Sequence, residues 1–391
     1  MRVQSVEIQK FRNHGRTTLI AAEGINAITG DNGEGKTNII EAISYLCLTK
    51  SFYATSDGVT LQKDQEEFRI NGAFTADNGA TRRVEVRYDK TSARKTVLLN
   101  NNAIETLSSI IGEFPVVVLS PEQNGITFGA PTERRKFLDM VIAQASRVYL
   151  RELLEYRKIL RQRNKILLDA KLARRDCSEI IEPWDQSLIE SGASLTQRRW
   201  LFVRDFLPGV ITAYKKIAGS GEIPGMEYLP SVRSMAPESI DAIKRSFEDE
   251  LRARKDEERR TGVTAVGPHR DEVEFQVDGM TLRKFASQGQ HKTYLVALKL
   301  AEVGYLKESC RENPILLLDD VFSELDVHRA GRLVLEVQSA GQVFITSTDL
   351  RSFPRKFSWR GNNRNFNVTG GSVAERGGLE HVHEAAGNSN N

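Results

Sequence analysis

The sequence predicts an α/β fold that carries a long helical insertion, and three observations lead to this prediction. An apolar run at residues 25–29 leads into a glycine-rich stretch, 30–37, which a helical pattern follows. A second apolar run, 314–318, ends in two carboxylates, and helix-like spacing dominates the chain between the two runs. Strand, loop and helix in succession, with a later buried strand, are typical of a parallel sheet covered by helices.

The glycine-rich stretch Gly30-Asp31-Asn32-Gly33-Glu34-Gly35-Lys36-Thr37 has the pattern of a phosphate-binding P-loop. Its glycines let main-chain N–H groups turn toward phosphate oxygens, and the following helix adds the positive end of its dipole. Lys36 would neutralise the β- and γ-phosphates, and the Thr37 hydroxyl would bind Mg²⁺. A chance glycine-rich turn is the alternative, but the strand before it and the helix after it argue against that. We therefore expect ATP and Mg²⁺ as cofactors.

The late apolar strand, residues 314–320, ends at Asp319 and Asp320. In a P-loop ATPase such a strand ends beside the P-loop, where Asp319 would hold the Mg²⁺ shell and Asp320 would polarise the attacking water. An ordinary buried strand with a polar end is the alternative. The candidate catalytic residues are thus Lys36, Asp319 and Asp320.

Composition sets broad limits on the class of protein. A chain of 391 residues has room for more than one domain, and a net charge of +3 says little about partners. Three cysteines far apart form no disulfide framework or zinc pattern, which favours a reducing compartment. The sequence shows neither a signal peptide nor a segment apolar enough to cross a membrane, so we expect a cytoplasmic protein without membrane contact.

The first third of the chain alternates strand and helix patterns. We expect a strand at an edge over 6–11, a buried strand over 25–29 and a helix over about 37–47. Residues 68–74, 83–88 and 95–99 predict an antiparallel β-layer, and residues 116–119 predict a strand covered on both faces.

From Thr132 onward the spacing is helical for a long way, with a break near Pro183, and it predicts an antiparallel helical arm. The first limb of the arm is basic. A solvated helix surface and a contact with the DNA backbone both explain these cations equally well. The candidate DNA-binding residues are Arg147, Arg151, Arg157, Lys158 and Arg161.

After the arm, residues 240–258 predict a charged helix and residues 273–282 a hairpin. Ser287-Gln288-Gly289-Gln290 precedes a helix over about 290–306, whose N-terminus is either a second anion site or a capped helix end. A helix over 329–338 and a strand over 342–346 then complete a parallel strand–helix–strand unit. The stretch 370–391 lacks apolar periodicity, and we expect it to be disordered.

Taken together, these motifs resemble the RecF family, bacterial recombination-repair ATPases related to SMC proteins. The resemblance rests on the P-loop, on residues 287–290 as an ABC-type signature and on residues 317–326 around the acidic strand. Phe11-Arg12-Asn13 and residues 120–122, 134–139 and 267–271 add to it. It covers about residues 1–350.

The resemblance implies an ABC/SMC-type P-loop ATPase head, a mixed sheet with an antiparallel β-layer, plus a helical arm domain. The head would comprise residues 1–131 and 259–369, with the arm at 132–258 and a tail at 370–391. ATP would be sandwiched between two copies, with Ser287, Gln288, Gly289 and Gln290 of one chain at the γ-phosphate bound by the other, so that ATP drives homodimerisation. Ser323 and Asp326 would form the D-loop. The implied ATP-binding residues are Arg12, Asn13, Gly30, Asn32, Gly33, Gly35, Lys36, Thr37 and Asn38.

The family resemblance also implies partners. RecF-like dimers clamp duplex DNA near single-stranded gaps and cooperate with RecR and RecO to load RecA. The implied activity is a weak DNA-linked ATPase. Turnover should be slow, because Asp320 stands where transporters have Glu and because hydroxyls at 346–348 replace the usual switch histidine. Gln123 is a candidate Q-loop residue, whereas His269 and Arg270 could serve either the dimer face or the fold.

Two other functions share these motifs. A transport-coupling ABC ATPase subunit also has a P-loop, a signature and an acidic strand, but it lacks a helical arm between them. An SMC-type nucleotide-gated scaffold with little hydrolysis is the other alternative, although this arm is too short for a long rod.

Overall fold

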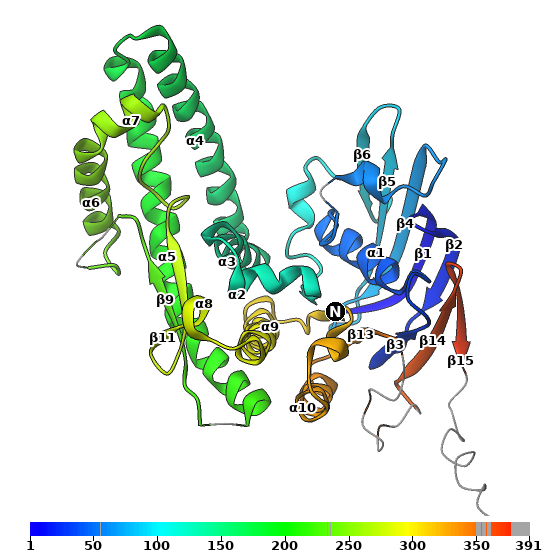
Figure 1. The fold of residues 1–391 in the computed structure, drawn as a ribbon. Helices are drawn as coiled ribbons and strands as arrows, with labels where there is room; N and C mark the ends of the chain where they lie inside the picture. Colours follow the sequence, from blue (N-terminus) through cyan, green and yellow to red (C-terminus); the bar gives the residue numbers. More distant parts are fainter. Residues whose placement is uncertain are drawn as a thin grey trace, which may run out of the picture. The chain divides into compact units, whose positions relative to one another are not determined.

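The computed structural model describes residues 1–54, 56–219, 221–232, 234, 236–348, 353, 357 and 361–376. The chain forms two compact units, which we call the head unit and the arm unit. The head unit combines residues 1–123 with the chain from Glu302 onward, and the arm unit comprises residues 124–301. The arm unit is longer than the arm expected over 132–258, because it also includes the late hairpin and the signature residues. Figure 1 shows the ribbon of both units.

One sheet of the head unit is antiparallel throughout, as expected for the β-layer. In spatial order its strands are β2 (His14–Ile20), β1 (Arg2–Phe11), β4 (Glu67–Thr75), β5 (Thr81–Asp89), β6 (Arg94–Leu99) and β7 (Asn102–Ala103). Alternate side chains of β4, such as Phe68, Ile70 and Phe74, are buried, which follows from the twofold period of a strand. This face forms one wall of the head core.

The second sheet of the head unit carries the nucleotide-binding motifs. Its strands, in spatial order, are β15 (Ser372–Arg376), β14 (Arg364–Thr369), β3 (Ile25–Thr29), β13 (Val343–Ser347), β12 (Ile315–Leu318) and β8 (Val116–Leu119). The neighbours from β14 to β8 are all parallel, and β15 alone runs antiparallel to its neighbour. The carboxyl ends of β3 and β12 therefore lie along one edge of the sheet, which is where the P-loop and the acidic strand end meet.

Helix α1 (Lys36–Leu48) lies between the two sheets (Figure 1). Every residue from Ile39 to Leu48 is buried, because the helix contacts strands of both sheets. Phe11, Tyr45 and Phe68 meet edge to face in this core, with ring centroids 5.2 to 5.8 Å apart. This packing fixes the first turn of α1, which carries the P-loop lysine.

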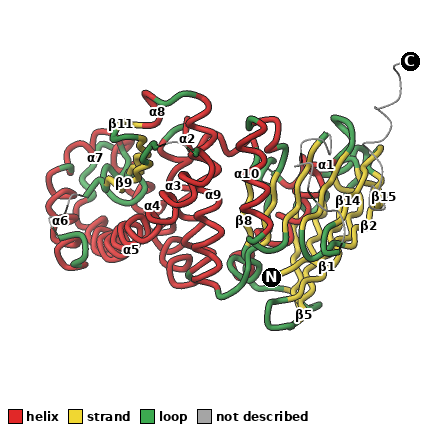
Figure 2. Tube along the Cα trace, turned by 90° about the horizontal axis from the view of Figure 1, so that it is seen from below, coloured by secondary structure: helices red, strands yellow, loops and turns green. Residues whose placement is uncertain are grey.

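The arm unit is built around a long antiparallel helical hairpin. Its limbs are α4 (Arg147–Ala173) and α5 (Ser178–Ala218), preceded by α2 (Gly125–Phe128) and α3 (Pro131–Ala145). Helices α6 (Ile240–Ala253) and α7 (Lys255–Thr261) pack against the hairpin. The tube in Figure 2 shows these helices in red. The predicted antiparallel arm is thus present.

A small antiparallel sheet completes the arm unit, with the order β11 (Met280–Thr281), β10 (Glu272–Val277) and β9 (Pro224–Leu229). The short helix α8 (Leu282–Phe285) follows, and then α9 (Gln288–Cys310), which begins at the signature residues. The chain returns to the head unit within α9, and α10 (Val327–Gln338) connects β12 to β13 there. Within the described residues, no helix is both long enough and apolar enough to span a membrane.

Four expectations about elements were wrong. Strand β1 is internal rather than at an edge, since residues 14–20 pair with it as β2. The break in the arm lies at 174–177, where Arg174 adopts a left-handed conformation, and Pro183 lies inside α5. The helix expected over 240–258 is divided at Arg254. Residues 370–376, expected to be disordered, form a turn and strand β15, whereas residues 377–391 lie outside the described residues.

Candidate nucleotide-binding site

The glycine-rich loop connects the carboxyl end of β3 to the first turn of α1, as the sequence pattern predicts. Gly30 and Gly35 have φ angles of +148° and +106°, which L side chains rarely adopt. A Cβ atom at Gly30 would meet the main-chain oxygen of Val368, and one at Gly35 would meet the Asn13 side chain. Both positions therefore require glycine, and the loop N–H groups stay accessible at the helix N-terminus.

Lys36 extends across this loop. Its Nζ atom donates hydrogen bonds to the main-chain oxygens of Gly30, at 2.8 Å, and Asp31, at 2.7 Å. Partial burial lowers the pKa of Lys36 from its ordinary value, and the carboxylates of Asp320, Asp31 and Asp319 oppose this by favouring the ammonium form. The ammonium group is thus held where the phosphates of a nucleotide on the loop would lie.

Asp319 lies at the end of β12 and contacts the first turn of α1. Thr37 Oγ1 donates a hydrogen bond of 2.8 Å to Asp319 Oδ1, and Thr346 Oγ1, at the end of β13, donates one of 2.7 Å to the same oxygen. The carboxyl group is buried, and burial raises its pKa, while both hydroxyl bonds act in the opposite direction. Three elements far apart in sequence therefore meet at one carboxylate.

The donor set of this site suits Mg²⁺. A hydroxyl and a carboxylate are hard oxygen ligands, and Mg²⁺ is typically held by one or two protein ligands together with phosphates and waters. Thr37 and Asp319 are already within 2.8 Å of one another, without any rearrangement of the chain. The described residues contain no cluster of three or more His, Cys, Asp or Glu side chains that would form an all-protein metal cage.

Asp320 differs from Asp319 in its surroundings. It is exposed, adopts a left-handed conformation with φ of +48°, and directs its main-chain N–H to Thr346 Oγ1 at 2.9 Å. Ser323 Oγ lies 2.9 Å from Asp320 Oδ2 and 2.8 Å from its main-chain oxygen, so the carboxylate is held at the sheet edge. An exposed and oriented carboxylate beside the Thr37–Asp319 pair can accept a proton from water.

Residues of the first hairpin support the P-loop. Asn13 Nδ2 donates to the main-chain oxygen of Glu34 at 2.8 Å, and Asn38 Nδ2 donates to Asn13 Oδ1 at 2.8 Å. Arg12 forms a two-bond ion pair with the buried carboxylate of Glu41, at 2.7 and 2.8 Å. Arg12, Asn13 and Asn38 thus lie beside the loop, where they bind protein groups, whereas Asn32 is exposed on the loop itself.

Two contributors were missed by sequence reasoning. His14 is buried and lies within 3.0 Å of the main-chain oxygen of Gly35 and 2.9 Å of Thr17 Oγ1. Burial lowers the pKa of His14, which favours the neutral form of its imidazole. Glu34 accepts hydrogen bonds from the main-chain N–H groups of Gly370 and Gly371, the turn of the last hairpin. His14 belongs to no recognisable motif, and only its adjacency to Asn13 pointed toward it. Glu34 lies within the P-loop stretch, but at a position where the motif does not specify the residue type.

The signature residues form the start of α9 in the arm unit. Ser287 and Gln290 cap this helix reciprocally, since Gln290 Oε1 accepts from Ser287 N–H at 2.8 Å and Ser287 Oγ accepts from Gln290 N–H at 3.2 Å. Ser287 and Gln288 are exposed, and Gly289 is partly so. The helix cap weighed in the sequence analysis is therefore present, and the exposed N-terminus keeps its positive dipole end toward solvent.

Three other residues named in the sequence analysis, Asp326, Gln123 and His269, differ in their surroundings. Asp326 caps α10 by accepting from the N–H groups of His328 and Arg329, at 3.0 and 2.9 Å. Gln123 follows β8 in a 3₁₀ turn, and its side-chain oxygen has no hydrogen-bond partner among the described residues. His269 supports the arm unit instead, because its ring lies 2.7 Å from Tyr156 Oη and 3.1 Å from the main-chain oxygen of Thr264.

The five candidate DNA-binding residues are all exposed on α4, but they do not share one environment. Arg151, Lys158 and Arg161 lie on one face of the helix, at the spacing of whole turns, and have no ion-pair partner among the described residues. Arg147 falls on the same face. Arg157, one turn before Arg161, differs because it pairs with Asp139 at 3.1 Å. We call Arg147, Arg151, Lys158 and Arg161 the basic stripe.

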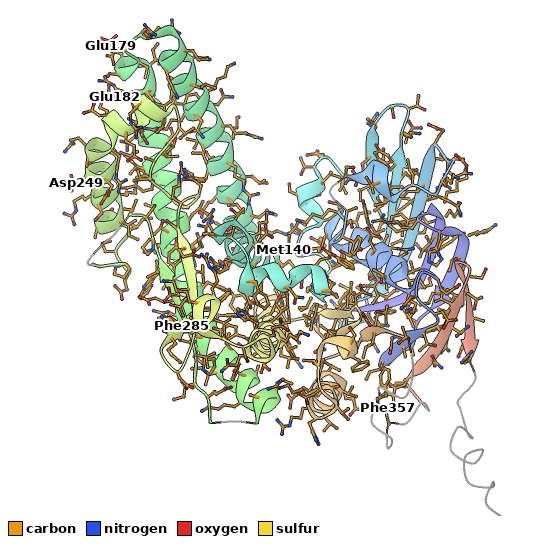
Figure 3. The ribbon with its side chains drawn as sticks, in the orientation of Figure 1. Met140, Glu179, Glu182, Asp249, Phe285 and Phe357 are labelled. Carbon is orange, nitrogen blue, oxygen red and sulfur yellow. The ribbon has the colours of Figure 1, made fainter. Side chains whose placement is uncertain are left out.

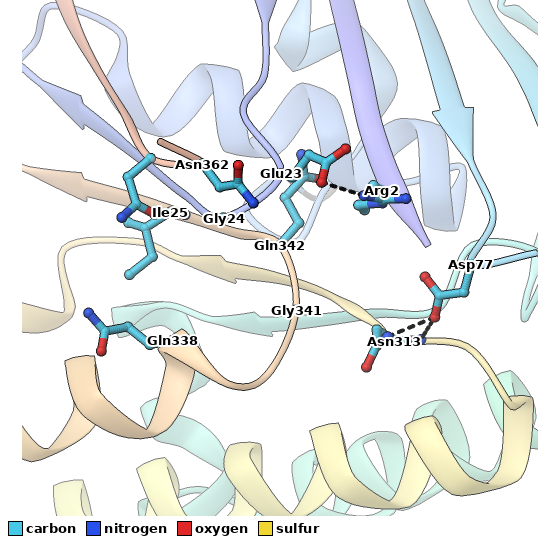
Figure 4. A pocket seen from close by; sticks show the side chains of 11 residues that line it. Arg2, Glu23, Gly24, Ile25, Asp77, Asn313, Gln338, Gly341, Gln342 and Asn362 are labelled. Atoms are coloured by element: carbon cyan, nitrogen blue, oxygen red, sulfur yellow. Dashed lines mark hydrogen bonds and ion pairs between the residues drawn. The ribbon is translucent and has the colours of Figure 1, made fainter. Parts of the chain in front are cut away.

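Figure 4 shows a second cavity of the head unit, of about 460 Å³, whose lining is largely polar. The cavity lies at the amino ends of β3, β12 and β13, because its lining includes Gly24, Asn313 and Gln342. Arg2 and Glu23, which also line it, form an ion pair at 2.6 Å. Ligands of open parallel sheets bind at the carboxyl ends of the strands. This cavity is therefore not the nucleotide site.

Comparisons with known proteins agree with this geometry. A family model described as the RecF/RecN/SMC N terminal domain matches residues 2–357. The DNA replication and repair protein RecF of Chloroherpeton thalassium is 42% identical over 356 residues, which are 90% of this chain and 96% of that protein. The structure of the recombination mediator protein RecF-ATP in the RecFOR pathway matches with a TM-score of 0.87 at 29% identity, covering 96% of this chain and 97% of that one.

A more distant likeness concerns the fold alone. The SMC head bound to the C-terminal winged helix domain of ScpA has a TM-score of 0.55 at 14% identity, and the match covers 97% of this chain and 98% of that one. The predicted fold class, an SMC-type ATPase head with a helical region, is confirmed.

Proposed function

The chain belongs to the RecF family of DNA replication and repair proteins, within the broader RecF/RecN/SMC N terminal domain family, and from this premise we propose that it is an ATP-gated DNA clamp. ATP would bind the head unit, join two copies and close them on duplex DNA near single-stranded gaps. Hydrolysis would then open the dimer. Such a protein acts on the chromosome, which in bacteria lies in the cytoplasm.

The single observation that carries the ATPase assignment is the 2.8 Å hydrogen bond from Thr37 Oγ1 to Asp319 Oδ1, with Asp320 next in the chain. Lys36 would neutralise the β- and γ-phosphates, and the loop N–H groups would bind their oxygens. Bound Mg²⁺ would supply charge neutralisation at these phosphates, with Thr37 and Asp319 as its protein ligands. Asp320 would orient the attacking water and accept its proton.

The clamp requires that each ATP be shared by two copies. The exposed Ser287 and Gln288 and the partly exposed Gly289 support this, because a helix N-terminus with free surface can approach an anion that another chain holds. The γ-phosphate would then join two positive helix ends that neither copy supplies alone. Loss of this shared ligand on hydrolysis would weaken the interface.

The basic stripe on α4 supports DNA as the partner. Exposed cations along one helix face bind the DNA backbone without reading sequence. RecO and RecR are proposed as partners because the related RecF is described as a member of the RecFOR pathway. A transport-coupling subunit is disfavoured, since the RecF relative extends over 90% of this chain, the arm included.

Sedimentation of the purified protein tests the proposal. The protein is measured without nucleotide, with ADP and with a non-hydrolysable ATP analogue, each with and without gapped duplex DNA. We expect a dimer only with the ATP analogue, and more dimer when DNA is present. A monomer under every condition would contradict the clamp and would indicate a subunit that needs a different protein to complete its ATP site.

A further inference from the structure

The far end of the helical arm holds a basic cavity that the ATPase mechanism does not use. Its volume is about 540 Å³, and its charged lining consists of Lys171, Arg174, Arg175, Asp176, Arg259 and Arg260. The apolar floor is formed by Leu167, Ala170 and Cys177, which are buried in a small core at this end of the arm. Five cations thus surround one cavity together with a single carboxylate.

Most of these cations are free to bind a ligand. Arg174, Arg175 and Arg260 are exposed and have no ion-pair partner among the described residues. Lys171 donates from Nζ to the main-chain oxygen of Thr261 at 3.1 Å, which leaves its charge uncompensated. Among these cations, Arg259 alone has an ion-pair partner within the described residues, Asp176. The cavity lining therefore carries an excess of positive charge.

Helix ends account for part of this charge. Helices α4 and α7 both end here, and cations in the last turn of a helix compensate the negative end of its dipole. That reason covers Lys171, Arg259 and Arg260. It does not cover Arg174 and Arg175, which follow the last residue of α4.

Arg174 occupies a position that favours glycine. Its φ is +50°, and the N–H of Arg175 donates to the main-chain oxygen of Ala170 at 3.1 Å, the arrangement of a Schellman helix end. Glycine adopts this conformation without steric cost, whereas arginine does not. Arg174 therefore stands at a position where the backbone alone favours glycine.

We propose that this cavity, which we call the tip site, binds phosphate groups of the DNA backbone. The proposal rests on the proposed DNA-binding function and adds a second contact region to the basic stripe. Guanidinium groups match phosphate oxygens through paired N–H donors, better than an ammonium would. Arg161 of the stripe lies on the same helix, ten residues before Lys171. Positive charge at two separate places on one long helix favours an extended DNA strand over a compact acidic partner.

The tip site is distant from the signature. Helix α4 has 27 residues and is about 40 Å long, and the tip site lies at its end whereas α3 joins its start. Glu179 and Glu182 lie on α5 at the same end of the arm (Figure 3), but neither lines the cavity. Substitutions at the tip site should therefore leave the nucleotide chemistry unchanged.

Fluorescence anisotropy with a labelled gapped duplex tests the tip site. Arg174→Gly removes the charge and relaxes the backbone, so we expect weaker DNA binding without a loss of melting temperature. The triple variant, which adds Arg175→Gln and Arg260→Gln, should bind DNA about tenfold or more weakly. The slope of log Kd against log salt concentration should also become smaller in magnitude, by about 0.9 for each phosphate that is no longer neutralised. Asp176→Asn, which frees Arg259, should act in the opposite direction.

One control and three possible results distinguish the tip site from the clamp. ATP binding and nucleotide-dependent sedimentation should match those of the parent protein in all variants. Unchanged DNA affinity and salt slope in the triple variant, while the parent binds DNA, would overturn the tip site and leave the clamp standing. A parent protein that does not bind DNA would contradict both. A triple variant that loses binding to labelled poly-glutamate but keeps its DNA affinity would contradict the tip site as a DNA contact and would indicate an acidic protein partner.

Discussion

Thr37 Oγ1 donates a 2.8 Å hydrogen bond to Asp319 Oδ1 across a separation of 282 positions in the chain. The bond joins the first turn of α1 to the end of β12, and Thr346 donates to the same carboxylate oxygen from β13. The nucleotide-binding edge is thus assembled from both ends of the sequence. Its two neighbouring carboxylates, Asp319 and Asp320, have different surroundings. Substitution of each should therefore affect a different step, ATP binding or ATP hydrolysis.

Asp319→Asn and Asp320→Asn should separate binding from hydrolysis. Asp319→Asn removes the charge that would hold Mg²⁺, so the affinity for ATP with Mg²⁺ should fall to the value measured in EDTA. Asp320→Asn removes the proton acceptor, so hydrolysis should slow by about 10² or more, while ATP binding changes little. Titration with a fluorescent ATP analogue measures the affinity, and the rate of phosphate release measures hydrolysis. Equal losses of binding in both variants would contradict the assignment.

Asn13→Ala should weaken ATP binding through the P-loop. The side chain loses one hydrogen bond to Glu34 and one from Asn38, each contributing about 1 kcal/mol. We expect the Kd for ATP to rise about five- to tenfold, since a less ordered loop must be fixed on binding. Arg16→Ala on β2 is the matched control, because the Arg16 side chain is 78% exposed. A Kd for Asn13→Ala equal to that of the control would show that the loop does not need this support.

The pH dependence of unfolding should contain a contribution from His269. Burial lowers its pKa in the folded state from 6.5 to about 4. Below pH 6.5 the unfolded chain therefore binds more protons, and stability is lost as the pH falls from about 6.5 toward 4. At pH 5 the loss amounts to about 2 kcal/mol. His269→Gln should reduce the difference in unfolding free energy between pH 7.5 and pH 5 by this amount.

Tryptophan emission can follow this unfolding in the arm unit. Trp184 and Trp200 both lie in α5, and Trp359→Phe removes the third tryptophan. The other titrating groups are common to both proteins, so their contributions cancel in the comparison. The same pH difference with and without His269 would contradict the burial argument.

The basic stripe should contribute to DNA affinity independently of sequence. Arg151→Gln, Lys158→Gln and Arg161→Gln together should weaken binding of a labelled duplex and reduce the magnitude of the salt slope, by about 0.9 for each phosphate contact. Arg157→Gln is the matched control on the same helix, since Arg157 pairs with Asp139 instead. An equal effect of the control would show that α4 contributes only general charge.

Much of the head unit could be predicted from the sequence. The P-loop, the acidic strand end and the parallel strand–helix–strand unit that follows it could be predicted from local patterns, because each motif requires a strand on one side and a helix on the other. His14 and Glu34 could not be predicted in the same way. Each acts through a main-chain group that only the tertiary fold brings near, Gly35 for His14 and the Gly370–Gly371 turn for Glu34.

The arm unit was predicted less completely. Helical spacing identified the arm, but Pro183 was taken as its break, although the break comes from the left-handed Arg174. Arg163 lies in the basic first limb of the arm, but it is buried and paired with Glu258 and Asp185 at 2.6 and 2.7 Å. Burial of an arginine depends on partners from other helices, which the periodicity of its own helix does not reveal.

The central claim, an ATP site shared between two copies, is tested most directly by mixing two inactive variants. Lys36→Met damages the P-loop and leaves the signature intact, whereas Ser287→Arg damages the signature and leaves the P-loop intact. A mixed dimer contains one site built from both undamaged halves, so an equal mixture should regain up to about a quarter of the parent ATPase rate if pairing is random. A mixture as inactive as either variant alone would contradict the shared site.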